Sequence, residues 1–165
     1  MKPSVLQLYP RLIPLKTGPR PLPYRALIGV GGIGSGSFFL LDGDRTLGRE
    51  ESRSGHFLDR RDYCKLHIIA HYVRTLLGPD FTALPIGRVG DDDIGRRLVL
   101  EMKAAGLDTR RIRTGTGEHT LFSFCFLYPD GSGGNLTTAD SACARLKPTA
   151  VAAAEKEFRP FRGQG

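Results

Sequence analysis

The chain has 165 residues, of which 40% are hydrophobic and 25% are charged. These proportions are ordinary for globular proteins, so they exclude a wholly disordered chain, and the length suits one domain with its own core. No apolar stretch approaches the roughly 18 residues that span a bilayer, so we expect no membrane partner. The net charge of +7 would suit nucleic acid, but most of this excess lies in residues 1–25, so we expect no nucleic-acid partner either.

Residues 1–25 are predicted to form a flexible, basic leader. They hold five basic residues, no acidic residue and six of the eleven prolines of the chain. Proline at this density disrupts helices and strand ladders, and the segment lacks the apolar core of a signal peptide. We therefore divide the chain into this leader and one domain over residues 26–165.

The three cysteines predict a reducing, cytoplasmic location. Cys64, Cys125 and Cys143 are odd in number and have no close spacing. They therefore fit neither a disulfide framework nor a zinc cluster.

The first half of the domain is predicted to contain a strand and a helix. Residues 26–30 form a short apolar run that stops at two glycines, as a buried strand does on entering a turn. Residues 42–56 are polar and interrupted by glycine, so we expect an exposed loop or short edge strands. Apolar residues recur at steps of three and four over residues 61–77, which predicts a helix that Gly78 and Pro79 end.

The same alternation continues along the chain. A buried strand is predicted over residues 81–86 and a turn over residues 87–90. Three aspartates at positions 91–93 are expected to cap a helix over residues 94–105, because carboxylates accept the free amides of a first helical turn. Repeated strand, turn and helix segments are typical of an α/β fold with a mostly parallel sheet.

The last third of the chain is predicted to return to strands. A long apolar strand is expected over residues 120–128, and residues 136–138 are its candidate hairpin partner after a Pro-Asp-Gly turn. Residues 147–158 are predicted to form one last helix, with Pro148 in its first turn.

Gly29, Gly31 and Gly34 have the spacing of a dinucleotide-binding fingerprint. That fingerprint needs a helix of several turns after its last glycine, and Gly36 leaves no room for one here. The pattern instead favours a tight turn where the backbone approaches a ligand or another strand.

A metal site is not favoured by the sequence. His67 and His71 lie one helical turn apart, but no third ligand has a suggestive spacing, so surface or core histidines are the preferred interpretation. The acidic run at positions 91–93 is explained by capping.

A more specific signal lies in residues 86–95, which read IGRVGDDDIG and are followed by a helix and by AGLD at 105–108. This segment resembles the G-x-V-G-x-D-x-x-G … G-[VL]-D segment of the PfkB, or ribokinase-like, carbohydrate kinases. The order of the surrounding elements agrees over roughly residues 26–147. The resemblance implies a three-layer α/β/α fold with a mostly parallel sheet and a small β lid. It also implies transfer of a phosphoryl group from ATP, with Mg²⁺, to a sugar hydroxyl.

The resemblance further implies that this chain supplies the acceptor side of such a kinase. In the family, an aspartate just after the first strand binds the acceptor, and its position falls near Gly36. A lid is expected from residues 42–56, where a homodimer would form. We take Gly36, Lys65 and Asn135 as candidate residues for binding a small sugar or sugar-like substrate.

The family's catalytic base and ATP anion hole lie on a Gly-Ala-Gly-Asp-like turn, and these 165 residues contain no such turn. We therefore interpret the chain as an apparently truncated, N-terminal portion of a kinase, with no catalytic residue of its own and no turnover alone. Two alternatives remain open. One is a non-catalytic sugar-binding or interaction module, and the other is an unstable gene fragment with exposed strand edges and apolar helix faces.

Overall fold

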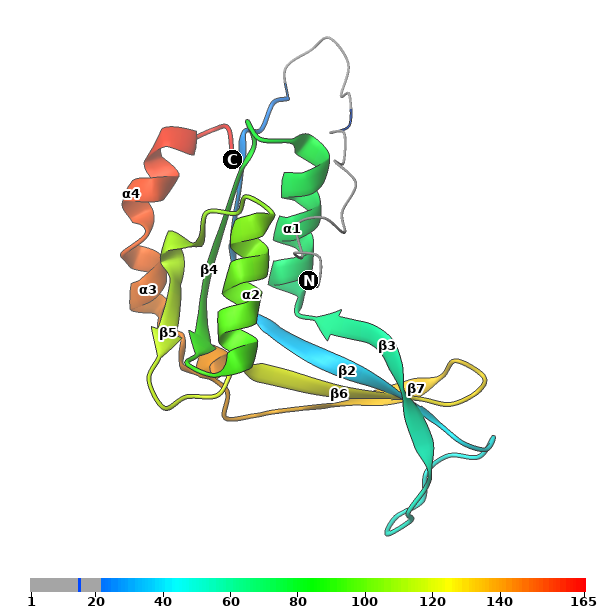
Figure 1. Ribbon diagram of the computed structural model, residues 1–165. Helices are drawn as coiled ribbons and strands as arrows, with labels where there is room; N and C mark the ends of the chain where they lie inside the picture. The colour runs from blue at the N-terminus through cyan, green and yellow to red at the C-terminus, as the bar shows by residue number, and fades with distance from the viewer. Residues whose placement is uncertain (1–14, 16–21) are drawn as a thin grey trace, which may run out of the picture.

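The computed structural model describes residue 15 and residues 22–165, and it contains two β-sheets (Figure 1). The strands are β1 (Ala26–Val30), β2 (Gly34–Leu41), β3 (Gly55–Tyr63), β4 (Thr82–Gly90), β5 (Ile112–Gly115), β6 (Leu121–Leu127) and β7 (Gly133–Thr137). The first sheet has the order β1, β4, β5 and is parallel throughout. The second sheet has the order β3, β2, β6, β7. Most of the predicted leader lies outside the described residues.

Helices cover both faces of the first sheet, which gives three layers (Figure 1). Two longer helices lie on one face and two short ones on the other. The helices are α1 (Lys65–Leu77), α2 (Asp93–Ala104), α3 (Pro148–Ala152) and α4 (Glu155–Phe158), with 3₁₀ turns at Thr109–Arg111, Ala142–Arg145 and Arg159–Phe161. No helix in the part of the chain described here is long and apolar enough to cross a bilayer.

β4 is the central strand of the first sheet, and its side chains alternate between the two helical layers. Val89 belongs to the core cluster that also holds Leu98 of α2. Ile86 belongs to a second cluster with Ala154, which lies between α3 and α4. Because β4 is buried on both faces, its sequence is a nearly continuous apolar run, as in other parallel sheets.

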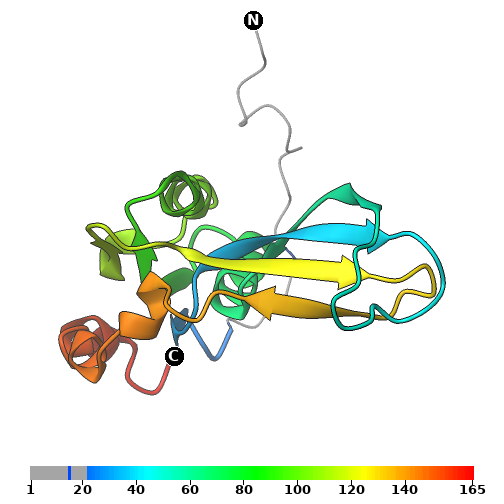
Figure 2. The same cartoon turned by 90° about the horizontal axis from the view of Figure 1, so that it is seen from below.

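The second sheet projects from the end of the first sheet and corresponds to the expected lid (Figures 1 and 2). Its central pair, β2 and β6, is parallel, and the outer strands β3 and β7 are antiparallel to their neighbours. Residues 42–54 connect β2 to β3 as a mostly exposed loop. The lid is therefore a four-stranded sheet, larger than the segment 42–56 in which it was expected.

The tight turn predicted for the pattern of Gly29, Gly31 and Gly34 is wrong from Gly34 onward, because Gly34 and the following Gly36 lie within β2. A Cβ atom at either position would come within 2.5 Å of a carbonyl oxygen of the neighbouring strand β6. The other part of this interpretation, that the backbone approaches another strand closely, is confirmed.

Asp92 ties the first sheet to the second. Its carboxylate accepts the Gly95 N–H at 2.8 Å and so caps α2, as predicted. It also accepts the N–H and the hydroxyl of Thr120 at 2.7 and 2.6 Å, and the Thr120 hydroxyl accepts the Gly90 N–H at 3.0 Å. Burial raises the pKa of Asp92, but the hydrogen bonds from Thr120 and Gly95 outweigh it and hold the pKa below its usual value. We call this group the Asp92–Thr120 clamp, and it fixes the start of β6.

Several predicted boundaries need correction. The first long helix starts at Lys65 rather than 61, because the residues before it pair with β2 as part of β3. The turn predicted over residues 87–90 is the end of β4, and β5, which pairs with it, was not predicted. The last predicted helix is interrupted near Ala154 and forms two short helices. The long strand and its hairpin partner are confirmed as β6 and β7.

Candidate functional site

One face of the second sheet carries a row of small and polar side chains. Gly36 on β2 pairs with Asp62 on β3 and with Ser123 on β6. Two residues further along β6, Cys125 pairs with Asn135 on β7. Because side chains alternate along a strand, these residues lie on the same face of the sheet. We call this face the polar face.

Hydrogen bonds link the side chains of the polar face across three strands. The Cys125 thiol donates to Asp62 Oδ2, with a sulfur–oxygen distance of 3.6 Å, and accepts from the Asn135 amide at 3.4 Å. The Thr137 hydroxyl in turn donates to Asn135 Oδ1 at 2.7 Å. Burial, the charge of Asp62 and their hydrogen bond raise the pKa of Cys125. Cys125 is therefore a protonated donor that orients the Asp62 carboxylate.

Gly36 makes room for this carboxylate. A Cβ atom at position 36 would lie 3.0 Å from the Cβ of Asp62 and 2.5 Å from the Ser123 carbonyl oxygen. No side chain fits at Gly36 without displacing its neighbours. Asp62 therefore presents a carboxylate beside the position where the family resemblance places an aspartate.

The polar face begins where the first sheet ends. β1 ends at Val30, and three residues carry the chain directly into β2. In open α/β sheets, ligands bind beyond the carboxyl ends of the parallel strands. The polar face is therefore placed at the edge of the sheet where such a site forms.

Two further cysteines lie at this junction. A Cβ atom at Gly32 would contact the sulfur atoms of Cys64 and Cys143 at 3.6 and 4.0 Å. Burial, followed by the nearby Cys143, raises the pKa of Cys64 to about 11. Cys64 is therefore a neutral thiol near pH 7 and not an activated nucleophile. All three cysteines of the chain are free in the structure.

The structure places two of the three residues proposed from the sequence on the polar face and the third outside it. Gly36 and Asn135 both lie on the polar face, on β2 and β7. Lys65 is exposed at the first position of α1, three residues after Asp62. Its side chain makes no hydrogen bond or ion pair to any described residue of the polar face.

Asp62 and Cys125 were not predicted as site residues from the sequence. Asp62 was assigned to the helix that begins at 61, so its strand pairing with Gly36 was not visible. A signal for Cys125 was present, because Ser123 and Cys125 alternate with phenylalanines along β6. This period of two separates a small, polar face from an aromatic one.

His67 and His71 on α1 lie side by side with their ring centroids 5.7 Å apart. The His67 side chain is buried, and its Nδ1 atom has no hydrogen-bond partner. Burial, and then the nearby His71, lowers the pKa of His67 to about 4. Over residue 15 and residues 22–165, no group of three or more His, Cys, Asp or Glu side chains is placed to hold a metal ion.

Comparison with solved structures shows what this arrangement resembles. A ribokinase from Giardia lamblia matches with a TM-score of 0.67 and 15% identity over 82% of this chain and 39% of that chain. A ribokinase from Cryptococcus neoformans in complex with ADP matches with a TM-score of 0.55 and 20% identity over 78% and 38% of the two chains. A proposed ribokinase II from E. coli in complex with ATP and Mg²⁺ matches with a TM-score of 0.59 and 19% identity over 82% and 40%.

The chain has a ribokinase-like fold. It spans about 40% of the length of the structures it matches. No family model matches the sequence, and no curated protein matches it. The predicted fold class, a ribokinase-like α/β/α architecture with a β lid, is confirmed.

Proposed function

We propose that this ribokinase-like chain forms the acceptor side of an ATP-dependent sugar kinase, which transfers a phosphoryl group to a sugar hydroxyl. The observation that carries the proposal is the Asp62 carboxylate on the polar face, oriented by Cys125 and placed over Gly36. A carboxylate accepts hydrogen bonds from hydroxyl groups, and hydrogen bonds to a charged group contribute about 1.5–3 kcal/mol each.

Asn135 complements Asp62 because its amide both donates and accepts hydrogen bonds. A sugar offers adjacent hydroxyls that also do both. We propose that Asp62 and Asn135 bind two hydroxyls of the acceptor, and that the lack of a side chain at Gly36 leaves room for the Asp62 side chain beside it. Lys65 is proposed as a further contact at the edge of the polar face.

The donor side of the reaction is proposed from the fold alone. Two of the similar ribokinase-type structures are described as complexes with ADP and with ATP and Mg²⁺. The described residues of this chain offer no cluster of ligands that fits Mg²⁺. We expect the isolated chain to bind an acceptor without phosphorylating it, because these 165 residues contain no Gly-Ala-Gly-Asp-like turn, which carries the base and the anion hole in the ribokinase-like kinases.

Isothermal titration calorimetry of the purified chain against D-ribose, D-fructose, D-glucose and adenosine tests the acceptor proposal. We expect at least one of these compounds to bind without nucleotide. The substitution Asp62→Asn, which keeps the shape of the side chain, should weaken that binding by roughly 10- to 100-fold.

Asp59→Asn is the matched control, since Asp59 lies on the same strand with an exposed side chain and belongs to no hydrogen bond of the polar face. It should leave the affinity unchanged. An equal loss in both variants, or no binding by the wild-type chain, would contradict the proposal. ATP-dependent phosphorylation of a sugar by the pure chain would contradict the expected lack of turnover.

The opposite face of the second sheet supports a homodimer through the lid, which we also propose. Phe57 is 66% exposed and packs edge-on against Phe39, with ring centroids 5.1 Å apart, and Phe124 lies 6.2 Å from Phe57. Leu136, which pairs with Phe124, is 64% exposed. Exposed apolar clusters of this kind are typical of interaction surfaces.

Analytical ultracentrifugation tests the homodimer. It should show a dimer for the wild type and a monomer for Phe57→Asp, and a wild-type monomer would refute the proposal.

We propose that the protein acts in the cytoplasm. The three free thiols suit a reducing compartment.

A further inference from the structure

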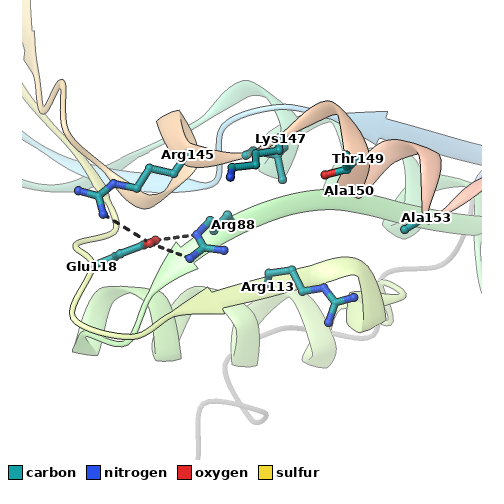
Figure 3. Close-up of a pocket in the computed structure, with 9 residues that line it drawn as sticks. Arg88, Arg113, Glu118, Arg145, Lys147, Thr149, Ala150 and Ala153 are labelled. Atoms are coloured by element: carbon teal, nitrogen blue, oxygen red, sulfur yellow. Dashed lines mark hydrogen bonds and ion pairs between the residues drawn. The ribbon is translucent and has the colours of Figure 1, made fainter.

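A second candidate site lies away from the polar face. A cavity of about 600 Å³ opens between the ends of β4 and β5, the 3₁₀ turn Ala142–Arg145 and α3 (Figure 3). Its charged lining comes from three stretches of the chain, at residue 88, residues 113–118 and residues 145–147. These charged residues are Arg88, Arg113, Glu118, Arg145 and Lys147.

An ion pair forms one wall of the cavity. Arg88 donates to both carboxylate oxygens of Glu118, at 2.6 and 2.7 Å. A Cβ atom at Gly115 would overlap Glu118 and come within 2.7 Å of Arg88, so the glycine leaves the space in which the pair sits. The Glu118 side chain is only 10% exposed. The pair is therefore a built part of the fold and not a loose surface contact.

The positive charge around this pair is not balanced. Arg113 pairs with Arg88 on the neighbouring strand and so lies on the same face of the first sheet. Arg145 lies 3.7 Å from a Glu118 oxygen that Arg88 already holds. Within residues 22–165, neither Arg113 nor Lys147 forms an ion pair. The lining thus carries four cationic groups and a single carboxylate.

Like charges that face one cavity repel one another, and an anion bound among them would relieve this repulsion. A guanidinium matches the geometry of phosphate oxygens with two parallel hydrogen bonds, and lysine supplies a compact point charge. The volume lies within the range of small-molecule sites. We propose that this cavity binds a phosphate-bearing small molecule, held by Arg113, Arg145 and Lys147. The proposal is independent of sugar binding at the polar face.

Glu118 has a defined role in this site. It orients Arg88 and at the same time neutralises part of the charge available to a ligand. Replacing it with glutamine removes the negative charge from the lining and releases Arg88 toward the cavity. Glu118→Gln should therefore strengthen anion binding, whereas loss of a cation should weaken it.

Titration calorimetry with inorganic pyrophosphate, using the whole chain at low ionic strength, tests the proposal. The double substitution Arg113→Ala/Lys147→Ala should weaken binding roughly tenfold, because it removes two of the three cations proposed to hold the anion. Glu118→Gln should strengthen binding several-fold. Higher salt should reduce the affinity of the wild type.

Lys103→Ala is the matched control, because Lys103 is an exposed cation on α2 that does not line the cavity. It should bind pyrophosphate as the wild type does, and a thermal melt of each variant without ligand should confirm that it is folded. Equal losses in the control and the double variant would overturn the proposal. Weaker binding by a folded Glu118→Gln variant, no pyrophosphate binding by the wild type, or binding of short RNA without pyrophosphate binding would each overturn it too.

Discussion

Protonation of His67 should destabilise the folded protein in mildly acidic solution. Its ring is buried against Tyr63 of β3 and His71, with ring centroids 4.9 and 5.7 Å away. Of the charged groups nearby, Glu101 of α2 favours the protonated ring and Arg97 opposes it. Burial outweighs the effect of Glu101, so the pKa in the folded chain is about 4, against an ordinary value of 6.5.

The sign of the effect follows from this difference. The unfolded chain takes up a proton at His67 below about pH 6.5, whereas the folded chain resists it until about pH 4. The stability contributed by neutral His67 is therefore present above pH 6.5 and is lost as the pH falls toward 4. At pH 5 the loss from this residue amounts to about 2 kcal/mol.

Urea denaturation at pH 7.5 and at pH 5 measures this loss. His67→Phe keeps an aromatic ring in the same place but cannot be protonated. Between pH 7.5 and pH 5, the free energy of unfolding of this variant should therefore fall by about 2 kcal/mol less than that of the wild type. His56→Gln, a change at an exposed histidine on β3, leaves His67 in place and should keep the full loss. The reasoning fails if His67→Phe and the wild type lose equal stability between the two pH values.

Two further substitutions test the clamp and the core by the same denaturation assay at pH 7.5. Asp92→Asn should lower the free energy of unfolding by about 2 kcal/mol, because the bonds from Thr120 and the helix cap weaken together, while Asp93→Asn, at a side chain 98% exposed, should change it by a few tenths. Equal effects of these two changes would refute the clamp. Leu98→Ala should lower the free energy of unfolding by about 2–5 kcal/mol, since Leu98 is fully buried. Leu100→Ala, at a residue that is 65% exposed, should lower it far less. A loss of stability at Leu98 as small as that at Leu100 would contradict the assignment of Leu98 to the core.

Two of the three strands of the first sheet, β1 and most of β4, could be predicted from the sequence because their signals are local. β1 and β4 are apolar runs ended by glycine or followed by a cap, and Asp92 caps α2 by accepting the amide of Gly95, three residues ahead in the chain. The kinase resemblance also depended on residues 86–95. Gly90, Asp92 and Gly95 of this motif take part in the Asp92–Thr120 clamp, which fixes the start of β6 in the second sheet.

The second sheet could be predicted only in part because its signals are not local. Gly34 and Gly36 have the appearance of turn residues, and only the close approach of β6 explains them as part of a strand. Asp62 lies in the polar, arginine-rich strand β3, which has no clear apolar alternation. Its role depends on a partner 26 positions earlier in the chain, and no pattern within β3 reveals that pairing.

The candidate site was therefore predicted incompletely. Asn135 was found because it is the one asparagine in the chain, and Gly36 because of its place after the first strand. The carboxylate that completes the polar face came from the structure. Lys65 was chosen by its position in the chain, and its contact with a sugar stays a prediction.

The most direct test of the acceptor site is an NMR titration of the ¹⁵N-labelled chain with D-ribose, D-fructose and D-glucose in turn. With at least one sugar, the amide signals of Asp62, Cys125 and Asn135 should shift in a saturable manner, while those of the cavity around Arg113 stay in place. Saturable shifts confined to residues outside the polar face, or no shifts with any sugar, would contradict the account.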